Sequence, residues 1–408
     1  EIGSGLVGSE MCIRDRQKVF VICTPRAASI ERIWERSKTE RKDMLSNRVL
    51  IVVNSVYQLI TAIHMKRTIL AQRNADLLLT DMLPNGEAYL PHLQEIRLFD
   101  RVIFARTREW IQKCSSGKKE DISELFQNIY QKFQWGLSDE LSLYCEVYFS
   151  NFDAFTRMLA SAFYAVSCEF ICYEDGFSSY VIDFLREDRS PINRHPEGRK
   201  IKDKITKVLL YEPHLAVRKD ELKNCPLPKI NRGDTAFKAI LNHVFDYQSP
   251  EQTADFIFLE QSFRAEGLKT NDISLMETCQ KIVGPGRFFV KPHPRNSENV
   301  AFQMGLTRKY TERIPWELFL LNEGLESKTI LTVCSSAALT SRIVFGMDVN
   351  TVMLYQLFEG KVLWKEDDIL KKYLRKFQRQ FSGKNYYVPQ TVYELANTLH
   401  YLGGHYAS

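Results

Sequence analysis

Short runs of aliphatic and β-branched residues alternate with amphipathic segments along most of this chain, and this alternation limits the possible folds most strongly. The first cycle is a strand predicted at residues 48–54, followed by a helix predicted at 57–72. Parallel strands need a crossover connection between them, and a helix usually supplies it. The pattern therefore predicts an α/β fold with parallel sheets covered by helices.

The alternation occurs in two blocks separated by a different kind of sequence. In the first block, further strands are predicted at 75–80, 102–105, 147–150 and 168–173, and helices at 119–133 and 155–166. In the second block, strands are predicted at 255–259, 287–290, 329–333 and 351–355, and helices at 272–283, 316–322, 336–345, 364–381 and 391–401. Two such blocks predict two Rossmann-like domains whose parallel sheets face a central cleft.

The stretch at 186–250 lies between the blocks and is rich in proline and charge. It is predicted to be an interdomain connection with helices at about 202–210 and 235–245. The N-terminal domain is then expected at 44–185 and the C-terminal domain at 251–385, with a terminal helix within 386–408.

Residues 1–43 are set apart from this organisation. Residues 6–16 read as a translated sequencing adapter, so the first 43 residues are expected to be an artefact with upstream read-through, and Met44 a plausible start. The alternative is a disordered N-terminal arm.

Composition narrows the choice of partners. The 408 residues are 44% hydrophobic and 26% charged, with a formal net charge of only +5, which gives no reason to expect nucleic-acid binding. Nine cysteines include no C-x-x-C pair, which suggests reduced thiols in a cytoplasmic protein. No uncharged apolar run reaches about 18 residues, the length expected of a transmembrane helix. A peripheral contact at the inner face of the cytoplasmic membrane stays open. The basic stretch at 199–207 is expected to be a solvated helix face, and attraction to an anionic membrane surface is the alternative.

An acidic turn follows the strand predicted at 168–173. Glu174 and Asp175 precede Gly176, so one carboxylate lies on a tight turn at the carboxyl end of a strand. Such a carboxylate can act as a general base or bind sugar hydroxyls. Because Asp-Gly is also a common turn pair, a purely structural turn is the alternative.

A histidine between two prolines follows the strand predicted at 287–290. Pro294 follows His293 and restricts its backbone, while Lys291 and Arg295 add positive charge suited to an anionic ligand. A protonated histidine there could neutralise a departing phosphate. A structural loop histidine is the alternative.

Three other polar groups occupy loops or helix starts in the second block. Ser335 and Ser336 begin a helix, where hydroxyl and backbone N–H groups suit a phosphate, although serine is also a common N-cap. Glu317 lies in a first helical turn and could bind ribose hydroxyls, or simply favour the helix dipole. Glu266 is a second candidate base in a polar loop. The chain has no D-x-D, Walker or G-x-G-x-x-G motif.

Taken in order, an acid-acid-Gly turn, an H-P pair, a P-x-E triplet and a double serine resemble the motifs of bacterial sialyltransferases. The closest resemblance is to glycosyltransferase family 52, which includes lipooligosaccharide sialyltransferases, and polysialyltransferases are relatives. The start of the first block, with Gln58, is also similar to that family, and the resemblance covers about residues 48–360.

The resemblance implies a GT-B fold that uses CMP-sialic acid as donor, with no metal and no other cofactor. It implies that His293 contacts the donor phosphate and assists its departure, and that Ser335 and Ser336 hold the same phosphate. It places Glu317 on the ribose. The base is either Asp175 or Glu266. Further substrate-binding residues are expected at Gln58, Glu174, Gly176, Lys291, Pro294 and Arg295.

The implied reaction is inverting transfer of sialic acid to a terminal sugar, expected to be galactose, of a surface glycan or glycolipid such as lipooligosaccharide. Polysialyl-, glucosyl- and glycerophosphotransferases are alternatives, as is a non-catalytic nucleotide-binding protein. The resemblance leaves a homodimer open.

Overall fold

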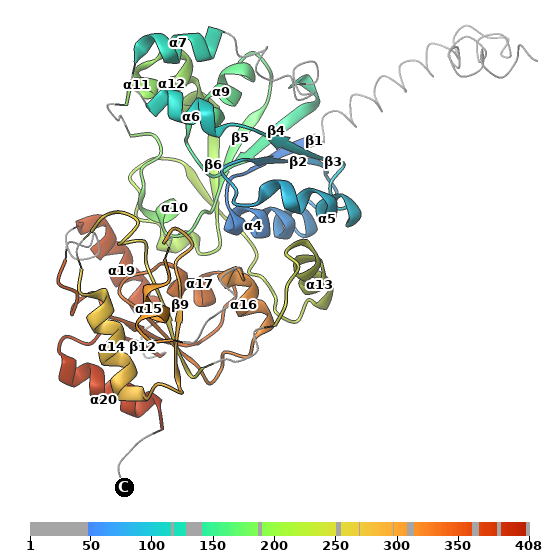
Figure 1. Cartoon of the computed structure of the whole chain (residues 1–408). Coiled ribbons are helices and arrows are strands. Elements are labelled where there is room, and N and C mark those ends of the chain that lie inside the picture. The colour runs from blue at the N-terminus through green and yellow to red at the C-terminus, as the bar shows by residue number, and fades with distance from the viewer. Residues whose placement is uncertain are drawn as a thin grey trace, which may run out of the picture.

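The structure is a computed structural model, and it describes residues 48–115, 118–127, 141–186, 190–249, 254–268, 270–296, 298–307, 314–360, 367–381 and 385–404. Two α/β domains lie one above the other (Figure 1), the first blue to light green and the second yellow to red. The predicted artefact at 1–43 and the end of the helix predicted at 119–133 lie outside the described residues.

The first domain is built around a sheet of parallel strands with helices on both faces. Its elements are β1 (Arg48–Val53), α4 (Val56–Arg67), β2 (Asn74–Thr80), η1 (Gly86–Tyr89), α5 (Leu90–Glu95), β3 (Arg101–Ala105), α6 (Arg108–Ser115), α7 (Lys119–Gln127), η2 (Leu141–Leu143), β4 (Tyr144–Phe149), α9 (Ala154–Ala162), β5 (Glu169–Tyr173), α10 (Ser178–Val181), α11 (Pro191–Arg194), α12 (Pro196–Lys204), β6 (Ile205–Leu210), η3 (Pro213–Leu215) and β7 (Lys223–Pro226).

The second domain repeats the architecture with shorter strands. Its elements, after the connecting helix α13 (Thr235–Val244), are β8 (Phe256–Leu259), α14 (Asp272–Val283), β9 (Phe288–Lys291), α15 (Val300–Gln303), α16 (Trp316–Asn322), β10 (Thr329–Thr332), α17 (Ala337–Ile343), β11 (Asn350–Met353), α19 (Asp368–Gln380), β12 (Tyr386–Tyr387) and α20 (Val392–Leu402).

The strand orders of both sheets contain a point where the direction of winding reverses. Among the described residues, the first sheet has the order β3-β2-β1-β4-β5-β6-β7 and the second β12-β11-β10-β8-β9, and every pairing is parallel. The reversals lie between β1 and β4 and between β8 and β10. Ligands of doubly wound sheets bind beyond the carboxyl ends of the strands at such points. The two facing sheets form the predicted GT-B architecture.

Burial explains why the apolar runs become strands. Residues 49–53 of β1 are at most 1% exposed, as expected of a parallel strand covered on both faces. Helix starts are capped by side chains: the Ser55 hydroxyl accepts the Gln58 N–H, and the Asp153 carboxylate accepts the Thr156 N–H. The caps begin α4 and α9 directly after β1 and β4, so the loops at the carboxyl edge are short.

Most predicted elements are confirmed, and several stretches differ. Helices at 272–283 and 316–322 have the predicted bounds. The helix predicted at 57–72 ends at Arg67. The helix predicted at 202–210 is wrong: α12 ends at Lys204 and β6 follows, because the run Ile-Thr-Lys-Val-Leu-Leu pairs with β5 and buries its apolar residues.

The expected connection at 186–250 thus contains two strands of the first sheet, β6 and β7. Pro226 can close β7 because this strand lies at the sheet edge, where a missing N–H costs no ladder bond. A strand, β12, also precedes the predicted C-terminal helix.

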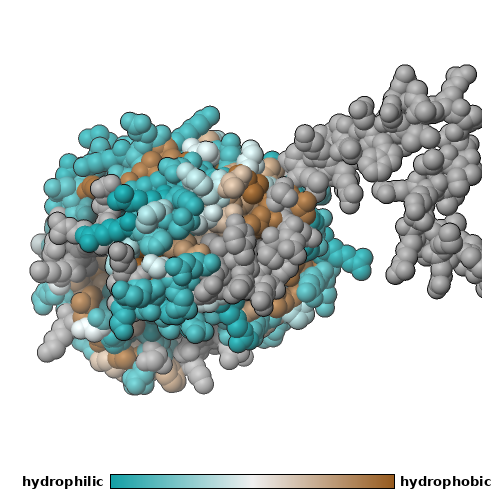
Figure 2. Space-filling model, turned by 90° about the horizontal axis from the view of Figure 1, so that it is seen from above, coloured by the Kyte–Doolittle hydropathy of each residue, from teal (hydrophilic) through white to brown (hydrophobic). Residues whose placement is uncertain are grey.

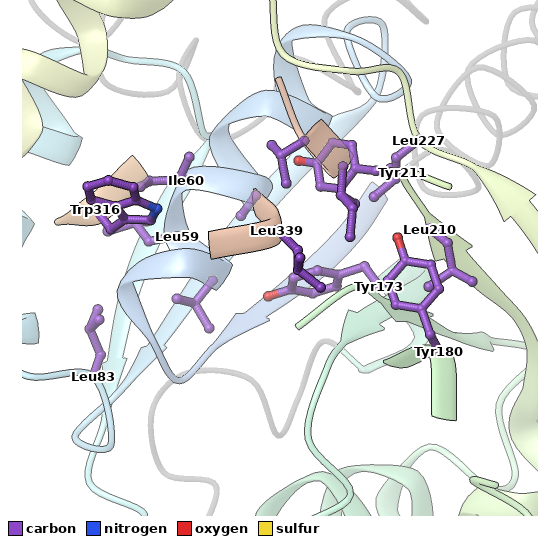
Figure 3. Packing of buried hydrophobic residues seen from close by; sticks show 14 of the residues in the cluster. Leu59, Ile60, Leu83, Tyr173, Tyr180, Leu210, Tyr211, Leu227, Trp316 and Leu339 are labelled. Carbon is purple, nitrogen blue, oxygen red and sulfur yellow. The ribbon is translucent and has the colours of Figure 1, made fainter. Parts of the chain in front are cut away.

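The two domains share buried apolar side chains. In the buried cluster of Figure 3, Trp316 and Leu339 of the second domain lie among first-domain residues that include Tyr173 and Tyr211. Helix α19 also returns to the first domain, where the Lys376 ammonium donates to the carbonyls of His214 and Ala216 at 3.0 and 2.8 Å. These contacts hold the carboxyl edges of the two sheets toward each other.

The outer surface is mostly hydrophilic in the view of Figure 2, with hydrophobic residues in small separate patches. Within the part of the chain that the structure describes, no helix has both the length and the apolar character needed to cross a membrane.

A buried carboxylate joins four strands of the first sheet. Asp76 on β2 is fully buried and accepts hydrogen bonds from the Arg101 guanidinium at 2.8 and 3.0 Å and from the Tyr144 hydroxyl at 2.5 Å. Its other oxygen lies 3.6 Å from Arg48. These partners come from β3, the start of β4 and β1, so the charge ties neighbouring strands at their amino ends.

We expect Asp76→Ala to lower the free energy of unfolding by about 3–5 kcal/mol, since the arginines lose a buried partner. Urea unfolding followed by circular dichroism measures the loss. Glu87→Ala is the control, because Glu87 and Arg106 form an exposed pair worth less than about 1 kcal/mol. Equal losses in the two variants would contradict this role of Asp76.

Candidate functional site

The acidic turn lies at the carboxyl end of β5, on the side facing the second domain. Gly176 has φ +72°, a left-handed conformation that favours glycine, and a Cβ there would meet nothing within 4 Å. Backbone conformation, and not lack of space, therefore explains the glycine. The Asp175 N–H donates to the Ser179 hydroxyl at 2.8 Å, which joins the turn to the start of α10.

Glu174 is buried and holds the turn in place. Its carboxylate accepts hydrogen bonds from the Tyr57 hydroxyl at 2.9 Å, the Tyr180 hydroxyl at 2.5 Å and the Tyr211 N–H at 2.8 Å. Burial raises the pKa of Glu174 to about 7, although these three donors act in the opposite direction. Because its oxygens are already bonded, Glu174 anchors the turn and leaves Asp175 as its accessible acid.

Asp175 is half-buried among polar side chains from two other strand ends. Burial raises its pKa, while hydrogen bonds from Gln58, Asn151 and Ser55 lower it. The Gln58 amide also donates to the Asn151 side-chain oxygen at 2.6 Å and accepts the Asn54 N–H at 2.7 Å. The predicted residue Gln58 thus spans the reversal between β1 and β4 and supports Asp175.

Lys291 and Glu317 are the charged residues that the second domain contributes near the acidic turn. Burial lowers the pKa of Lys291 to about 8, and the charge of Glu317 opposes that shift. Burial raises the pKa of Glu317, with Lys291 lowering it and Asp175 raising it further. Glu317 therefore senses the charge of a cation of its own domain and of the acid of the first domain.

His293 is half-buried in the loop after β9, with Pro294 and Arg295 exposed beside it. Its Nδ1 accepts the Arg295 N–H at 3.2 Å, so the neutral ring carries its proton on Nε2. Burial lowers the pKa of His293, and the charges of Arg295 and Lys291 lower it further. The lowered pKa favours the neutral ring, which can donate a hydrogen bond from Nε2.

Glu266 lies on the outer side of the His293 loop. Its side chain is 50% exposed and lies 3.9 Å from Arg295. The Ser262 hydroxyl donates to its carboxylate at 2.6 Å. The two predicted bases are thus in different surroundings: Asp175 is half-buried beside Gln58, Asn151 and Ser55, and Glu266 belongs to an exposed ion pair with Arg295.

The double serine joins β10 to α17. The Ser335 N–H donates to the Thr332 hydroxyl at 3.1 Å, and the Ser335 hydroxyl accepts the Ala337 N–H at 3.3 Å. Ser336 makes no side-chain cap bond in this helix. It lines a narrow interdomain cavity of about 10 Å³ together with Glu174 and Gly176, so the second serine and two residues of the acidic turn share one space.

Several residues near these motifs had no role assigned from sequence. They are Ser55, Tyr57, Asn151, Glu260 and Gln261, and each closely follows a strand end. Their position directly after a strand was therefore the one feature of the sequence that could have indicated a role in the site. Which side chains reach Asp175 or His293 depends on strand order, which sequence did not provide.

Two facing Rossmann-type domains, each with a doubly wound parallel sheet, define a protein of the GT-B fold. Residues 49–355 match the family model of alpha-2,8-polysialyltransferase (POLYST), and the chain belongs to this family. The predicted resemblance to sialyltransferases is confirmed at this level, while membership of family 52 stays a prediction. No curated protein matches the chain.

Solved structures similar to the chain are distant from it in sequence. A protein of Listeria monocytogenes assigned as a UDP-N-acetylglucosamine 2-epimerase has 14% identity and a TM-score of 0.44, over 86% of this chain and 93% of that one. MurG of Acinetobacter baumannii has 10% identity and a TM-score of 0.43, over 88% and 89%. A glycosyltransferase of Rickettsia africae has 13% identity and a TM-score of 0.41, over 88% of each chain.

The buried carboxyl of Glu174 makes stability depend on pH. Its pKa is about 7 in the folded protein, against an ordinary value of 4.5. Between these values the folded protein binds more protons than the unfolded chain, so its free energy of unfolding falls as the pH rises. Glu174→Gln cannot ionise. From pH 5 to pH 8 its stability should improve relative to wild type, by up to about 3 kcal/mol.

Urea unfolding of both proteins at several pH values measures this difference. Glu266→Gln, which removes an exposed carboxylate, is the matched control. A difference between wild type and Glu174→Gln that does not change with pH would contradict the raised pKa.

Proposed function

We propose that this protein is an inverting, metal-independent sialyltransferase that moves sialic acid from CMP-sialic acid to a terminal sugar of a surface glycan. One observation carries the proposal: Glu174 and Gly176 of the acidic turn and Ser336 of the double serine line the same interdomain space. Asp175, the candidate base, lies between the two turn residues in the sequence. A base on one side and phosphate-binding groups on the other are what transfer from a nucleotide sugar requires. Family membership supports the same class of reaction.

On the acceptor side, Asp175 is the proposed base. Burial raises its pKa toward the working pH, which favours proton transfer. Gln58 and Asn151 orient the carboxylate. The acceptor hydroxyl attacks the anomeric carbon, a carbon–oxygen bond forms, and the hydroxyl proton passes to Asp175. Attack from the face opposite the leaving group inverts the anomeric carbon.

On the donor side, the bond between the anomeric carbon and the phosphate oxygen breaks, and CMP leaves with the electron pair. We assign stabilisation of its charge to Nε2–H of His293, the hydroxyls of Ser335 and Ser336, and the Lys291 ammonium. Lys291 is mostly protonated at pH 7, because its pKa is about 8. Glu317 is the proposed ligand of the ribose hydroxyls. The transition state has oxocarbenium character, as in glycoside hydrolysis.

Domain motion is part of the proposal. The space shared by Gly176 and Ser336 is about 10 Å³, room for about one water molecule. A nucleotide sugar is far larger than this cavity. For the donor to enter between Gly176 and Ser336, the two domains must therefore separate. Closure around the donor then excludes water and limits hydrolysis.

Two acceptors are considered. The motif resemblance to family 52 favours a galactose-terminated acceptor such as lipooligosaccharide. The family model favours a second candidate, extension of a sialic acid-terminated chain through an α-2,8 linkage. Both use the same donor and the same departure of CMP, and they differ only in the sugar beside Asp175.

We expect the purified protein to form sialylated product from CMP-sialic acid in EDTA, with CMP released in proportion. Galactose-terminated and sialic acid-terminated acceptors are compared by mass spectrometry of the products. His293→Ala is the negative control, and we expect it to lose far more than threefold in turnover while it remains folded. Product formed only from CDP- or UDP-linked donors would overturn the proposed donor.

The choice of base is tested by a matched pair of variants. We expect Asp175→Asn to lower kcat by about 10²–10⁴, the usual contribution of a general base. Glu266→Gln should stay within about threefold of wild type, because its carboxylate is exposed beside Arg295. Steady-state rates with saturating donor measure both. The opposite ranking would assign the base to Glu266.

A further inference from the structure

Two consecutive residues, Glu260 and Gln261, follow β8 and lie between the two loops assigned to the donor phosphate. Strand β8 is flanked by β9, which leads into the His293 loop, and by β10, which leads into the double serine. A pair of side chains at the end of β8 can therefore reach both loops at once.

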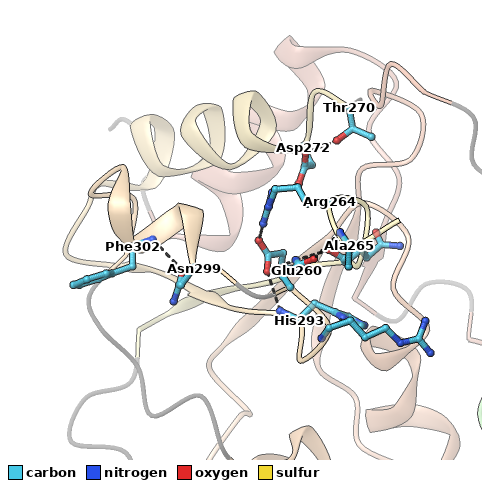
Figure 4. A network of polar contacts seen from close by, with 11 residues as sticks. Glu260, Arg264, Ala265, Thr270, Asp272, His293, Asn299 and Phe302 are labelled. Carbon is cyan, nitrogen blue, oxygen red and sulfur yellow. Dashed lines mark hydrogen bonds and ion pairs between the residues drawn. The ribbon is translucent and has the colours of Figure 1, made fainter. Parts of the chain in front are cut away.

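Glu260 holds the His293 loop. It is 3% exposed (Figure 4). One of its carboxylate oxygens accepts hydrogen bonds from the backbone N–H of His293 at 2.9 Å and from the side-chain amide of Asn296 at 2.8 Å. The backbone adds a further bond, from the Glu260 N–H to the Lys291 carbonyl at 3.1 Å. Bonds to backbone N–H and amide groups fix where the loop lies, and with it the histidine ring.

The other oxygen of Glu260 is paired with Arg264, whose guanidinium also binds Asp272 at 3.1 Å. A buried carboxylate with all of these partners has no free oxygen for an acceptor hydroxyl. Glu260 is therefore suited to positioning the loop and unsuited to the role of base, although it directly follows the strand.

Gln261 holds the serine loop from the other side. Its side-chain oxygen accepts the Cys334 N–H at 2.8 Å, and its amide donates to the Cys334 thiol at 3.1 Å. Cys334 immediately precedes Ser335. The Gln261 side chain thus crosses the point between β8 and β10 where the winding of the sheet reverses, which is where a ligand of such a sheet binds.

We propose that Glu260 and Gln261 are positioning residues that set the spacing between His293 and the double serine, so that both reach one phosphate. The inference rests on the proposed function for the identity of that phosphate, the one in CMP. Since hydrogen-bond donors contribute to binding only at the right distance, a small displacement of either loop weakens the phosphate contacts together. The sugar and base of the nucleotide should be affected much less.

The test compares binding of CMP and of cytidine to the full chain by calorimetry. We expect Gln261→Met, which keeps the side-chain length and removes both polar groups, to weaken CMP binding by about tenfold or more, or about 1.4 kcal/mol. Cytidine binding should change by less than about twofold. Glu260→Met should act in the same way, and Glu260→Gln, which keeps an acceptor oxygen for the loop, should restore most of the affinity.

The matched control is Asp255→Asn. Asp255 pairs with Arg287 at 2.7 Å, and this pair joins the same two strands, β8 and β9, at the edge away from the site. We expect it to leave the ratio of CMP to cytidine affinity unchanged. Thermal melting of each variant identifies those that do not fold, and Gln261→Met, which leaves no charge unpaired, carries the test if Glu260→Met fails.

Kinetics separate positioning from general stability. In the transfer reaction, the variants at Glu260 and Gln261 should lower kcat as well as raise KM for the donor, because departure of the phosphate needs both loops. Equal losses of CMP and cytidine affinity, or unchanged CMP affinity in Gln261→Met, would overturn the inference. If the wild type bound UDP or CDP instead of CMP, the proposed function would fail, and the same comparison of nucleotide with nucleoside would still decide the inference.

Discussion

Both sheets have only parallel strands among their described pairings, and the site depends on this constraint. Parallel strands present all their carboxyl ends along one edge, so every strand-to-helix loop of a domain lies on the same side. Residues far apart in sequence, such as Gln58 and Asp175, are thereby brought together. The two edges face each other because α19 returns to the first domain and the buried cluster is continuous between domains.

Burial at this interface gives the cleft its electrostatic character. Carboxylates that leave water become harder to ionise, which raises the pKa of Asp175, Glu174 and Glu317, while the same effect lowers that of Lys291. Acids and a cation with shifted pKa values gathered in one cleft are typical of a functional site. Glu174 differs from the other groups in its role. Three hydrogen-bond donors already occupy its carboxylate, so it stabilises the acidic turn.

Sequence patterns predicted the fold well where local and tertiary preferences agree. Runs such as residues 49–53 are short, apolar throughout and rich in β-branched residues, which favours a buried strand. Prediction failed at 205–210, because a single run of six residues with two lysines nearby fits a basic helix as well as a strand. Its pairing with β5, a contact with distant sequence, decided the outcome. The proline-rich composition of 186–250 also concealed an edge strand, where proline is tolerated.

By itself, the sequence determined the α/β class, the two blocks, and the motifs that follow strand ends, because periodicity and turn chemistry are local properties. It also carried the family resemblance, since Glu317, His293 and the two serines occur in a recognisable order. Tertiary structure alone decided which of these groups meet. Strand order places Gln261 between two loops and leaves Glu266 in an exposed ion pair, and neither can be inferred from distance along the chain.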